Sequence, residues 1–400
     1  MEEKNLSKLR ILVVDNEVFV LNLCVRILKN IGCENVITAN SGKQALEKLN
    51  QAQKNFDVII CDLNMPEIDG IEFMRHISEK NFTGGIILFS GEDQRMLEVV
   101  RDLAKAHKLN VFGAIQKPLK PDVLKLLLDN YKSAQTKKKF TPQKPITEKE
   151  LRAGLDGDEL QLVFQPKVKI ADGTIMGVET LARWNHADRG ILGSGAFIPL
   201  AEKVGLINDL TKVIYRKAMI QTGEWHANAI DIKVSVNVSI NNFTLEGFSD
   251  FLVTTAKEQG VDLSKVILEV TESQVMADVQ GCLEILIQLR MKKFGLSMDD
   301  FGIGQSTMEQ LKRIPFTELK IDRAFVHGAS HNSGARAILE SSLQLAKRLN
   351  METVAEGAET REDWDLVESL ECDYVQGFYC AKPMPNEKLI EFIETWTGPH

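Results

Sequence analysis

The sequence predicts two α/β domains in tandem: an open parallel sheet with helices on both faces, followed by a modified eight-stranded β/α barrel. Three observations lead to this fold class. Strand-like apolar runs alternate with helical patterns five times over residues 1–132, and a polar segment follows over residues 133–148. Residues 149–400 then carry eight further strand-like runs, most of them separated by helical patterns, in a segment as long as a barrel domain.

The composition is that of a globular protein. Hydrophobic residues make up 44% and charged residues 26% of the chain, and the net charge of −8 gives no general attraction to DNA or to an anionic membrane. No apolar run approaches the ~20 residues that cross a bilayer, and Ile11–Val14 is too short for a secretory signal. The six cysteines form no Cys-x-x-Cys pair, which favours buried reduced thiols and a cytoplasmic location.

Five strand-like runs make up the first domain, and each precedes a segment with the apolar spacing of a helix. The runs are Arg10–Val14, Val36–Thr38, Val58–Cys61, Ile86–Phe89 and Val111–Ile115. The helical segments are Val18–Leu28, Ser41–Leu49, Gly70–Ile77, Gln94–His107 and Asp122–Tyr131. In an open parallel sheet, functional sites lie beyond the carboxyl ends of the strands.

Polar residues stand at four of those strand ends: Asp15, Asp62, Ser90 and Lys117. This arrangement resembles the receiver domain of two-component response regulators, the CheY-like family with a flavodoxin-like (βα)5 fold. The resemblance implies that Asp62 is the phosphoacceptor, that Asp15, Ser90 and Lys117 complete the site with one Mg²⁺, and that Lys117–Pro118 is a cis peptide. It also implies a sensor histidine kinase or phosphotransfer protein as partner. A carboxylate can act as the nucleophile, and a cation and a hydroxyl can hold the added charge.

Two positions depart from that family pattern. Asn16 follows Asp15 where a second acid is expected, so Mg²⁺ should bind less well unless Glu17 substitutes. Ala114 stands where the family often has an aromatic switch residue. The alternative is therefore a receiver fold that no longer accepts phosphate.

Residues 133–148 are interpreted as a polar connector. They contain four lysines and two prolines and almost nothing apolar. A short basic run of this kind is typically a solvated surface and not a contact with a phosphate backbone.

The second domain begins with two strand-like runs joined only by Ala171–Thr174, which is typical of a hairpin. Its first strand is therefore expected to be antiparallel to its neighbour. The eight runs are Leu160–Val168, Thr174–Leu181, Ile232–Val238, Val266–Val270, Phe294–Met298, Glu318–Ile321, Glu352–Val354 and Tyr374–Val375. The helical patterns are Ile207–Trp225, Phe248–Gln259, Val279–Met291, Ala335–Leu349 and Arg361–Leu370.

The run Phe294–Met298 leads directly into Asp299 and Asp300, with Gly302 and Gly304 after them. Because successive strand residues point to opposite sides, both carboxylates can face one spot only if the strand has ended. The glycines would release the chain from strand geometry. The pair then offers two oxygen ligands for a divalent metal, whereas a solvated Asp-Asp turn is the plain alternative.

Other strand ends of this domain carry further polar groups. They are Glu179, Asn237, Glu269, Lys320, Glu356 and Gln376. If they converge with the two aspartates on one face of the barrel, so many carboxylates cannot share a dry pocket without cations. Oxygen-only ligands favour Mg²⁺ or Mn²⁺ over zinc. Two such ions beside a lysine form an apparatus for the attack of water on a phosphodiester.

Taken together, these motifs resemble the EAL-domain phosphodiesterases, which have a TIM-type barrel and hydrolyse cyclic di-GMP to linear pGpG. The match rests on Glu179–Trp184, Asn237, Glu269–Glu272, Asp299–Gly304, Leu319–Asp322 and Ala355–Gly357. The order of a receiver followed by an EAL domain is similar to that of the RocR-type response regulators.

The resemblance implies a role for each matching residue. Two Mg²⁺ or Mn²⁺ ions are expected on Glu179, Asn237, Glu269, Asp299 and Asp300, with Asp299 as the bridge. Glu356 would contact metal or deprotonate the attacking water, and Lys320 would orient that water or stabilise the developing charge. The cyclic dinucleotide would be positioned by Gln165, Leu181, Arg183 and Gln376, and the loop after Asp300 would be held in order by Glu272 and Glu359.

Two departures and one alternative function accompany this resemblance. Thr180 replaces the Ala of the Glu-Ala-Leu motif but leaves the expected ligand Glu179 in place. Residues 304–307 differ from the family's commoner aromatic-Ser-Ser, so the family's loop dynamics and dimer coupling are not carried over to this chain. The alternative is a catalytically silent module that senses cyclic di-GMP or docks a protein partner. The family also implies a homo-oligomer, and nothing after Thr397 could form a DNA-binding helix pair.

Overall fold

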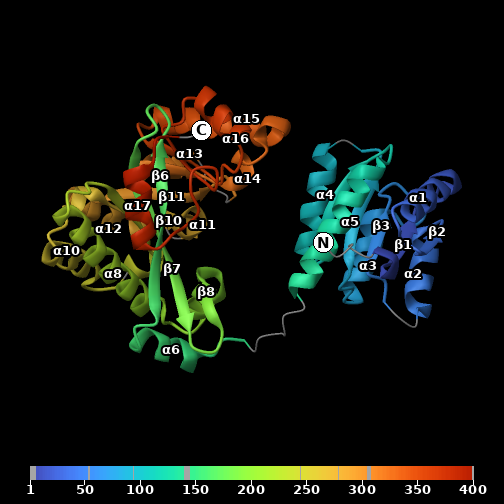
Figure 1. Ribbon diagram of the computed structural model, residues 1–400, viewed down its shortest axis with the longest axis horizontal. Coiled ribbons are helices and arrows are strands. Elements are labelled where there is room, and N and C mark those ends of the chain that lie inside the picture. Colours follow the sequence, from blue (N-terminus) through green and yellow to red (C-terminus); the bar gives the residue numbers. More distant parts are fainter. Residues whose placement is uncertain are drawn as a thin grey trace. The chain divides into compact units, whose positions relative to one another are not determined.

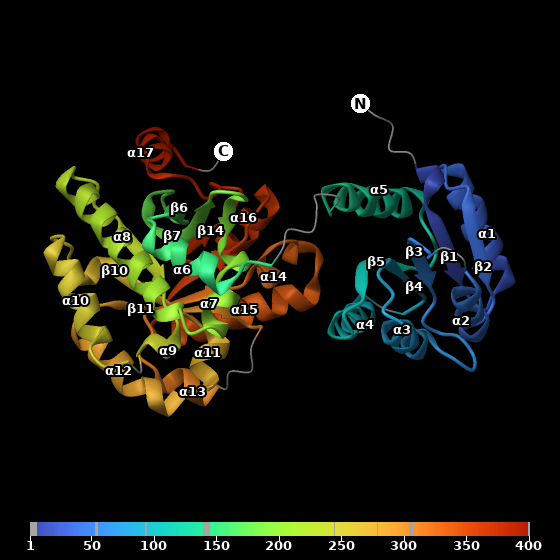
Figure 2. The same cartoon turned by 90° about the horizontal axis from the view of Figure 1, so that it is seen from below.

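The chain divides into two compact units, Met1–Lys144 and Pro145–His400. The computed structural model (Figures 1 and 2) describes residues 6–52, 55–92, 94–138, 145–243, 245–277, 279–303 and 308–398. The last helix of the first unit continues through Lys138, so residues 133–138 of the segment interpreted as a connector are helical. Residues 139–144 of that segment lie outside the described residues, and helix α6 begins at its end, at Glu148.

The first unit is a five-stranded parallel sheet of order β2-β1-β3-β4-β5, which confirms the predicted fold. Its strands are β1 (Arg10–Val14), β2 (Asn35–Ala39), β3 (Val58–Cys61), β4 (Gly85–Ser90) and β5 (Asn110–Gln116). Its helices are α1 (Val18–Asn30), α2 (Gly42–Gln51), α3 (Gly70–Glu79), α4 (Gln94–Ala106) and α5 (Pro121–Lys138).

Each face of this sheet has its own hydrophobic core. Buried residues of α1 and α5 pack on one face, and those of α2, α3 and α4 pack on the other. Because strands β3 and β4 are buried at every position, they read as unbroken apolar runs and not as alternating ones. This two-sided packing leaves the carboxyl ends of the strands as the open edge, where the polar residues stand.

The second unit is a closed barrel. Its strands follow the order β6-β14-β13-β12-β11-β10-β9-β7, and β6 pairs with β7 to close the ring. Strand β6 is antiparallel to both β7 and β14, whereas the other neighbours in the ring are parallel. The predicted hairpin and antiparallel first strand are therefore confirmed. The strands are β6 (Leu160–Lys169), β7 (Ile175–His186), β9 (Lys233–Asn237), β10 (Val266–Thr271), β11 (Gly295–Phe301), β12 (Glu318–Ile321), β13 (Glu352–Glu356) and β14 (Tyr374–Gln376).

Helices surround the barrel (Figure 2), and the five predicted from periodicity are α8, α10, α12, α15 and α16. Their bounds are Ile207–Ala227, Phe248–Glu258, Val279–Met291, Ser333–Arg348 and Arg361–Ser369. The sequence analysis did not predict strand β8 (Gly190–Gly193), which pairs with β7, nor the helices α6 (Glu148–Asp156), α7 (Ile198–Lys203), α9 (Ile240–Phe243), α11 (Glu272–Ala277), α13 (Met308–Arg313), α14 (Arg323–Val326) and α17 (Asn386–Thr395). Short 3-10 helices cover Leu6–Lys8, Ser194–Ala196, Leu263–Lys265 and Ala329–His331.

The cysteines and the lengths of the helices agree with the composition. Cys24, Cys33, Cys61, Cys372 and Cys380 are free and buried, and the side chain of Cys282 lies outside the described residues. In the described part of the chain, each helix is too short or too polar to cross a bilayer.

Candidate active site

The polar residues of the first unit meet at one edge of the sheet, as expected from their positions at strand ends. The Lys117 Nζ atom lies 2.8 Å from an oxygen of Asp15 and 2.8 Å from an oxygen of Asp62. Both carboxylates are buried, and so is Ser90 at the end of β4. The two acids raise the pKa of Lys117 against the opposing effect of its burial. The Lys117–Pro118 peptide is cis, as predicted.

The two departures noted in this unit lie close to that edge. The backbone N–H of Glu17 donates to Asp15 Oδ1 over 2.8 Å, and the Glu17 side chain is exposed. Ala114 is partly buried within β5 and packs against the core of the α2, α3 and α4 face. A small side chain at this position therefore fills core space and presents no ring.

In the second unit, Asp299 and Asp300 lie within a strand and not after it, so the prediction that the strand ends at Met298 was wrong. Strand β11 continues to Phe301, and its pairing with β12 shifts by one residue between Met298 and Phe301. Such a bulge turns one residue out of the regular alternation. Asp300 takes the left-handed backbone conformation with φ of 57°. The bulge therefore does what the glycines were expected to do, and both carboxylates turn toward one spot.

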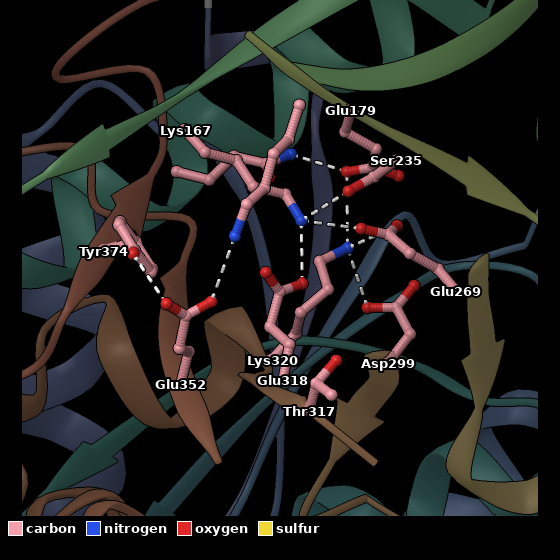
Figure 3. Close-up of polar contacts among 12 residues, drawn as sticks. Lys167, Glu179, Ser235, Glu269, Asp299, Thr317, Glu318, Lys320, Glu352 and Tyr374 are labelled. Carbon is pink, nitrogen blue, oxygen red and sulfur yellow. Dashed lines mark hydrogen bonds and ion pairs between the residues drawn. The ribbon is translucent and has the colours of Figure 1, made fainter. Parts of the chain in front are cut away.

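Lys320 is the centre of the site, and its fully buried ammonium group contacts four carboxylates, of which Figure 3 labels Glu179, Glu269 and Asp299. Its Nζ atom lies 3.3 Å from Glu179 Oε2, 2.9 Å from Glu269 Oε2, 3.0 Å from Asp299 Oδ1 and 2.8 Å from Glu356 Oε1. These acids come from β7, β10, β11 and β13, so the barrel gathers residues that are up to 177 positions apart (356 minus 179).

Two groups of three carboxylates have the spacing of a metal site. Ligand oxygens of Glu179, Glu269 and Asp299 lie within 4.8 Å of one another, and so do those of Asp299, Asp300 and Glu356. Asp299 belongs to both groups. Asn237 adjoins the first, since its Nδ2 donates to Glu179 Oε1 over 2.8 Å. The candidate metal ligands are all carboxylate or amide oxygens, which are the ligands that a hard divalent cation prefers.

The pKa values of three of these carboxylates are raised, which favours the binding of an added cation. Burial raises the pKa of Glu356 well above its usual range, and nearby Asp299 and Glu179 raise it further against Lys320. Burial likewise raises the pKa of Glu179 and of Asp300. A buried carboxylate that resists ionisation is stabilised by an added cation. The residues present therefore fit divalent metal.

Residues assigned to substrate contact occupy different depths. Gln165 and Gln376 are buried and linked, with Gln376 Nε2 donating to Gln165 Oε1 over 3.2 Å and to Glu179 Oε2 over 2.5 Å. Leu181 lines a cavity of about 320 Å³ that also exposes Glu179, Asn237, Glu269, Asp299 and Asp300. Arg183 is not among the residues that line this cavity, and its Nη1 donates to the carbonyl of Ala182 over 2.9 Å.

The two acids assigned to loop support differ in their contacts. Glu272 accepts a hydrogen bond of 2.9 Å from the backbone N–H of Gly302, immediately after the bulge. Glu359 pairs instead with Arg323 of α14 over 2.8 Å. Residues 304–307, whose sequence departs from the family pattern, lie outside the described residues. In the described part of the chain, Glu272 therefore has a direct contact with the start of that loop.

One buried group beside the site was missed by the sequence analysis. The Lys167 ammonium lies beneath the carboxylates and contacts Ser235, Glu269 and Glu318, each over 2.8 Å (Figure 3). Burial opposes the ionisation of Glu269, but Lys167 and Lys320 hold its pKa at about 2. Lys167 lies inside the predicted strand Leu160–Val168 and Glu318 begins the predicted strand Glu318–Ile321, and a charged residue within a predicted barrel strand is a signal that could have identified them.

Comparison with known proteins supports two domains of known families. The model of the response regulator receiver domain matches residues 11–129, and the model of the EAL domain matches residues 148–383. The chain belongs to the EAL-domain family. Its EAL domain is thus the barrel that carries the carboxylates, and its receiver domain is the five-stranded unit that carries Asp62.

Two relatives and two solved structures place the EAL domain among known proteins. The cyclic di-GMP phosphodiesterase RocR of Pseudomonas aeruginosa is 28% identical over 391 residues, or 97% of this chain and 99% of RocR. The bifunctional diguanylate cyclase/cyclic di-GMP phosphodiesterase MucR of that organism is 39% identical, over 61% of this chain and 36% of MucR. A structure of the PaMucR phosphodiesterase in complex with c-di-GMP is 39% identical with a TM-score of 0.58, covering 60% of this chain and 98% of that one. The EAL enzyme Bd1971, bound to cAMP and cyclic di-GMP, is 26% identical with a TM-score of 0.59, covering 68% and 75%.

Proposed function

We propose that the EAL domain hydrolyses cyclic di-GMP to linear pGpG with Mg²⁺ or Mn²⁺, and that phosphorylation of the receiver domain controls its rate. The observation that carries this proposal is the pair of carboxylate groups that share Asp299 around Lys320. Two relatives, RocR and MucR, bear the name of cyclic di-GMP phosphodiesterase.

The charge of the site supports a pair of divalent ions. Glu179, Glu269, Asp299, Asp300 and Glu356 contribute five negative charges, and Lys320 contributes one positive charge. Two divalent ions would balance the remaining four. Asn237 would add a neutral oxygen ligand to the first group, and Asp299 would serve both ions.

Each side chain then has a part in the reaction. The ions, when bound, supply Lewis-acid stabilisation of the phosphodiester and acidify water. Glu356 accepts the proton of the attacking water. Lys320, in contact with Glu356 over 2.8 Å, holds that carboxylate in place and stabilises the negative charge that develops on the phosphoryl oxygens.

The proposal also assigns the residues around the metal groups. Leu181 contacts the cyclic dinucleotide from the cavity wall, and Arg183, two residues later on the same strand, binds its phosphate or base. Gln165 and Gln376 fix the carboxylate of Glu179 by their hydrogen-bond chain. Glu272 holds Gly302 and with it the start of the loop after the bulge, and Glu359 acts through its ion pair with Arg323 of α14.

The test is hydrolysis of cyclic di-GMP by the full-length protein. With Mg²⁺ or Mn²⁺ we expect linear pGpG as the product, and with EDTA we expect none. The same metal should raise the melting temperature, because an ion that binds only the folded state stabilises it. Absence of pGpG with either metal, with and without a phosphodonor, would contradict the proposal. Binding of the dinucleotide in EDTA without hydrolysis after metal is restored would instead support the silent sensing module.

Control by the receiver domain is tested with Asp62→Asn. This variant removes the proposed phosphoacceptor and keeps the volume of the side chain. We expect that acetyl phosphate, a small phosphodonor, changes the rate of pGpG formation by the wild-type protein and not by the variant. The basal rate without phosphodonor should be the same for both proteins. An identical response of the two proteins would show that Asp62 does not carry the signal.

A further inference from the structure

The interior of the barrel contains a second buried cation that the proposed reaction does not use. Lys167 Nζ lies 2.8 Å from each of three oxygen atoms: Ser235 Oγ, Glu269 Oε1 and Glu318 Oε1. The exposed fractions of these residues are 3% for Lys167, 1% for Ser235, 0% for Glu269 and 3% for Glu318. Three donor hydrogens therefore meet three acceptors in a site closed to solvent.

The reversed direction of β6 explains why this lysine lies beneath the site. Alternate residues of a barrel strand face the interior, and each step of two residues moves along the axis. Gln165 faces the mouth, where it meets Gln376. Lys167 follows two residues later on a strand that runs away from the mouth, where it pairs with Gly177, so it lies one layer deeper.

Glu269 contacts both Lys167 and Lys320. Lys167 binds its Oε1 over 2.8 Å, and Lys320 binds its Oε2 over 2.9 Å. With both oxygens held, the plane of this carboxylate is fixed from below and from the side. A metal ligand with a fixed orientation costs less to organise when an ion binds.

We propose that Lys167 is a positioning residue that orients Glu269 from beneath and thereby sets the affinity of the barrel mouth for divalent ions. This proposal rests on the proposed metal-dependent function. Lys167 contacts no ion or substrate itself and acts only through Glu269. A purely structural role, in which Lys167 does no more than neutralise Glu318, is the competing explanation.

A double variant separates the two explanations. Lys167→Met alone leaves a buried carboxylate unpaired and destabilises the fold in either case. Lys167→Met combined with Glu318→Gln removes one charge of each sign and leaves the charge of the interior unchanged. Glu269 then keeps Lys320 and loses its lower contact. Glu318→Gln alone is the matched control, since it leaves the contact between Lys167 and Glu269 in place.

The measurement is direct binding of Mn²⁺ to full-length protein, followed by the loss of the electron paramagnetic resonance signal of free Mn²⁺. We expect the double variant to bind Mn²⁺ about 10- to 100-fold more weakly than wild type, the range typical for loss of an outer-shell partner. Glu318→Gln should bind Mn²⁺ within about twofold of the wild-type affinity, since Lys320 and Lys167 both still contact Glu269. At saturating Mn²⁺ the turnover of the double variant should recover to near that of the control.

A second variant serves if the double variant does not fold. Ser235→Ala keeps every charge but removes one of the three acceptors that hold the Lys167 ammonium against Glu269, whereas the amide oxygen in Glu318→Gln still accepts from Lys167. Ser235→Ala should therefore weaken Mn²⁺ binding about fivefold, the effect of one ordinary hydrogen bond. Equal Mn²⁺ binding by wild type, Ser235→Ala and any folded double variant would overturn the proposal. Because Mn²⁺ binding is measured without substrate, it decides the role of Lys167 even if the protein forms no pGpG.

Discussion

Asp299→Asn is expected to abolish formation of pGpG while the protein stays folded. Asp299 is the residue common to both carboxylate groups, so its loss weakens both proposed ions together. Metal ions contribute several kcal/mol of charge stabilisation to such a reaction, and each 1.36 kcal/mol is a factor of ten. We therefore expect kcat/KM to fall by at least about 10³. The measurement is pGpG formation at saturating Mg²⁺, with circular dichroism as the check on folding.

The matched control for this substitution is Asp262→Asn. Asp262 is exposed, and its carboxylate accepts hydrogen bonds from the backbone and side chain of Ser264 at the start of a 3-10 helix. The control should turn over at the wild-type rate. An Asp299→Asn protein with wild-type activity would show that the two carboxylate groups do not act through a shared ligand.

Lys320→Met should lower both the stability and the activity of the protein, and Mg²⁺ should restore the stability but not the activity. Lys320 is the direct partner of four buried or half-buried carboxylates, so in EDTA its loss removes their shared cation and leaves only Glu269 in contact with Lys167. Breaking a buried charge group in this way costs about 3–5 kcal/mol. In a domain of this size that cost corresponds to a melting temperature lower by about 10 °C. Saturating Mg²⁺ should restore most of the loss, because the ions supply the missing charge.

Activity of Lys320→Met should not return with stability. A cation aimed at developing charge is worth about 10²–10³ in kcat, so that loss is expected even in saturating Mg²⁺. Lys265→Met is the control, since Lys265 pairs with exposed Asp231 at the surface and such pairs contribute little. Calorimetry in EDTA and in Mg²⁺ measures the two melting temperatures. Equal stability of Lys320→Met and wild type in EDTA would show that Lys320 does not neutralise the carboxylates.

The fold class could be predicted because the main signals are local. Buried strands such as β3 and β4 appear as short apolar runs, and the long helices α8, α12 and α15 have clear helical spacing. The turn Ala171–Thr174 is too short for a crossover, which is why the antiparallel first strand could be predicted. Short elements such as β8 and α9 have too few residues to show a period, and they were missed.

The candidate site was predictable where a polar residue ends an apolar run, as at Glu356 or Gln376. The bulge at Asp300 was not, since it depends on how β11 pairs with β12, and a pairing register is a property of two segments. Lys167 escaped for a related reason. Its contacts with Glu269 and Glu318 span 102 and 151 positions, and only the closed barrel brings these residues together.

The reversed strand β6 also decides which parts of the barrel can change independently. In the parallel strands, later residues lie nearer the mouth, but in β6 the earlier residue Gln165 lies there and Lys169 lies at the far end, opposite Tyr374. The turn after β6 is thus remote from the carboxylates. The carbonyl of Gly173 in that turn accepts a hydrogen bond of 2.7 Å from Nε1 of Trp396, which follows helix α17. An insertion at this turn, for example of a reporter group, should therefore be tolerated. It would lengthen the end of the barrel opposite the carboxylates and leave the strand pairing at the mouth unchanged.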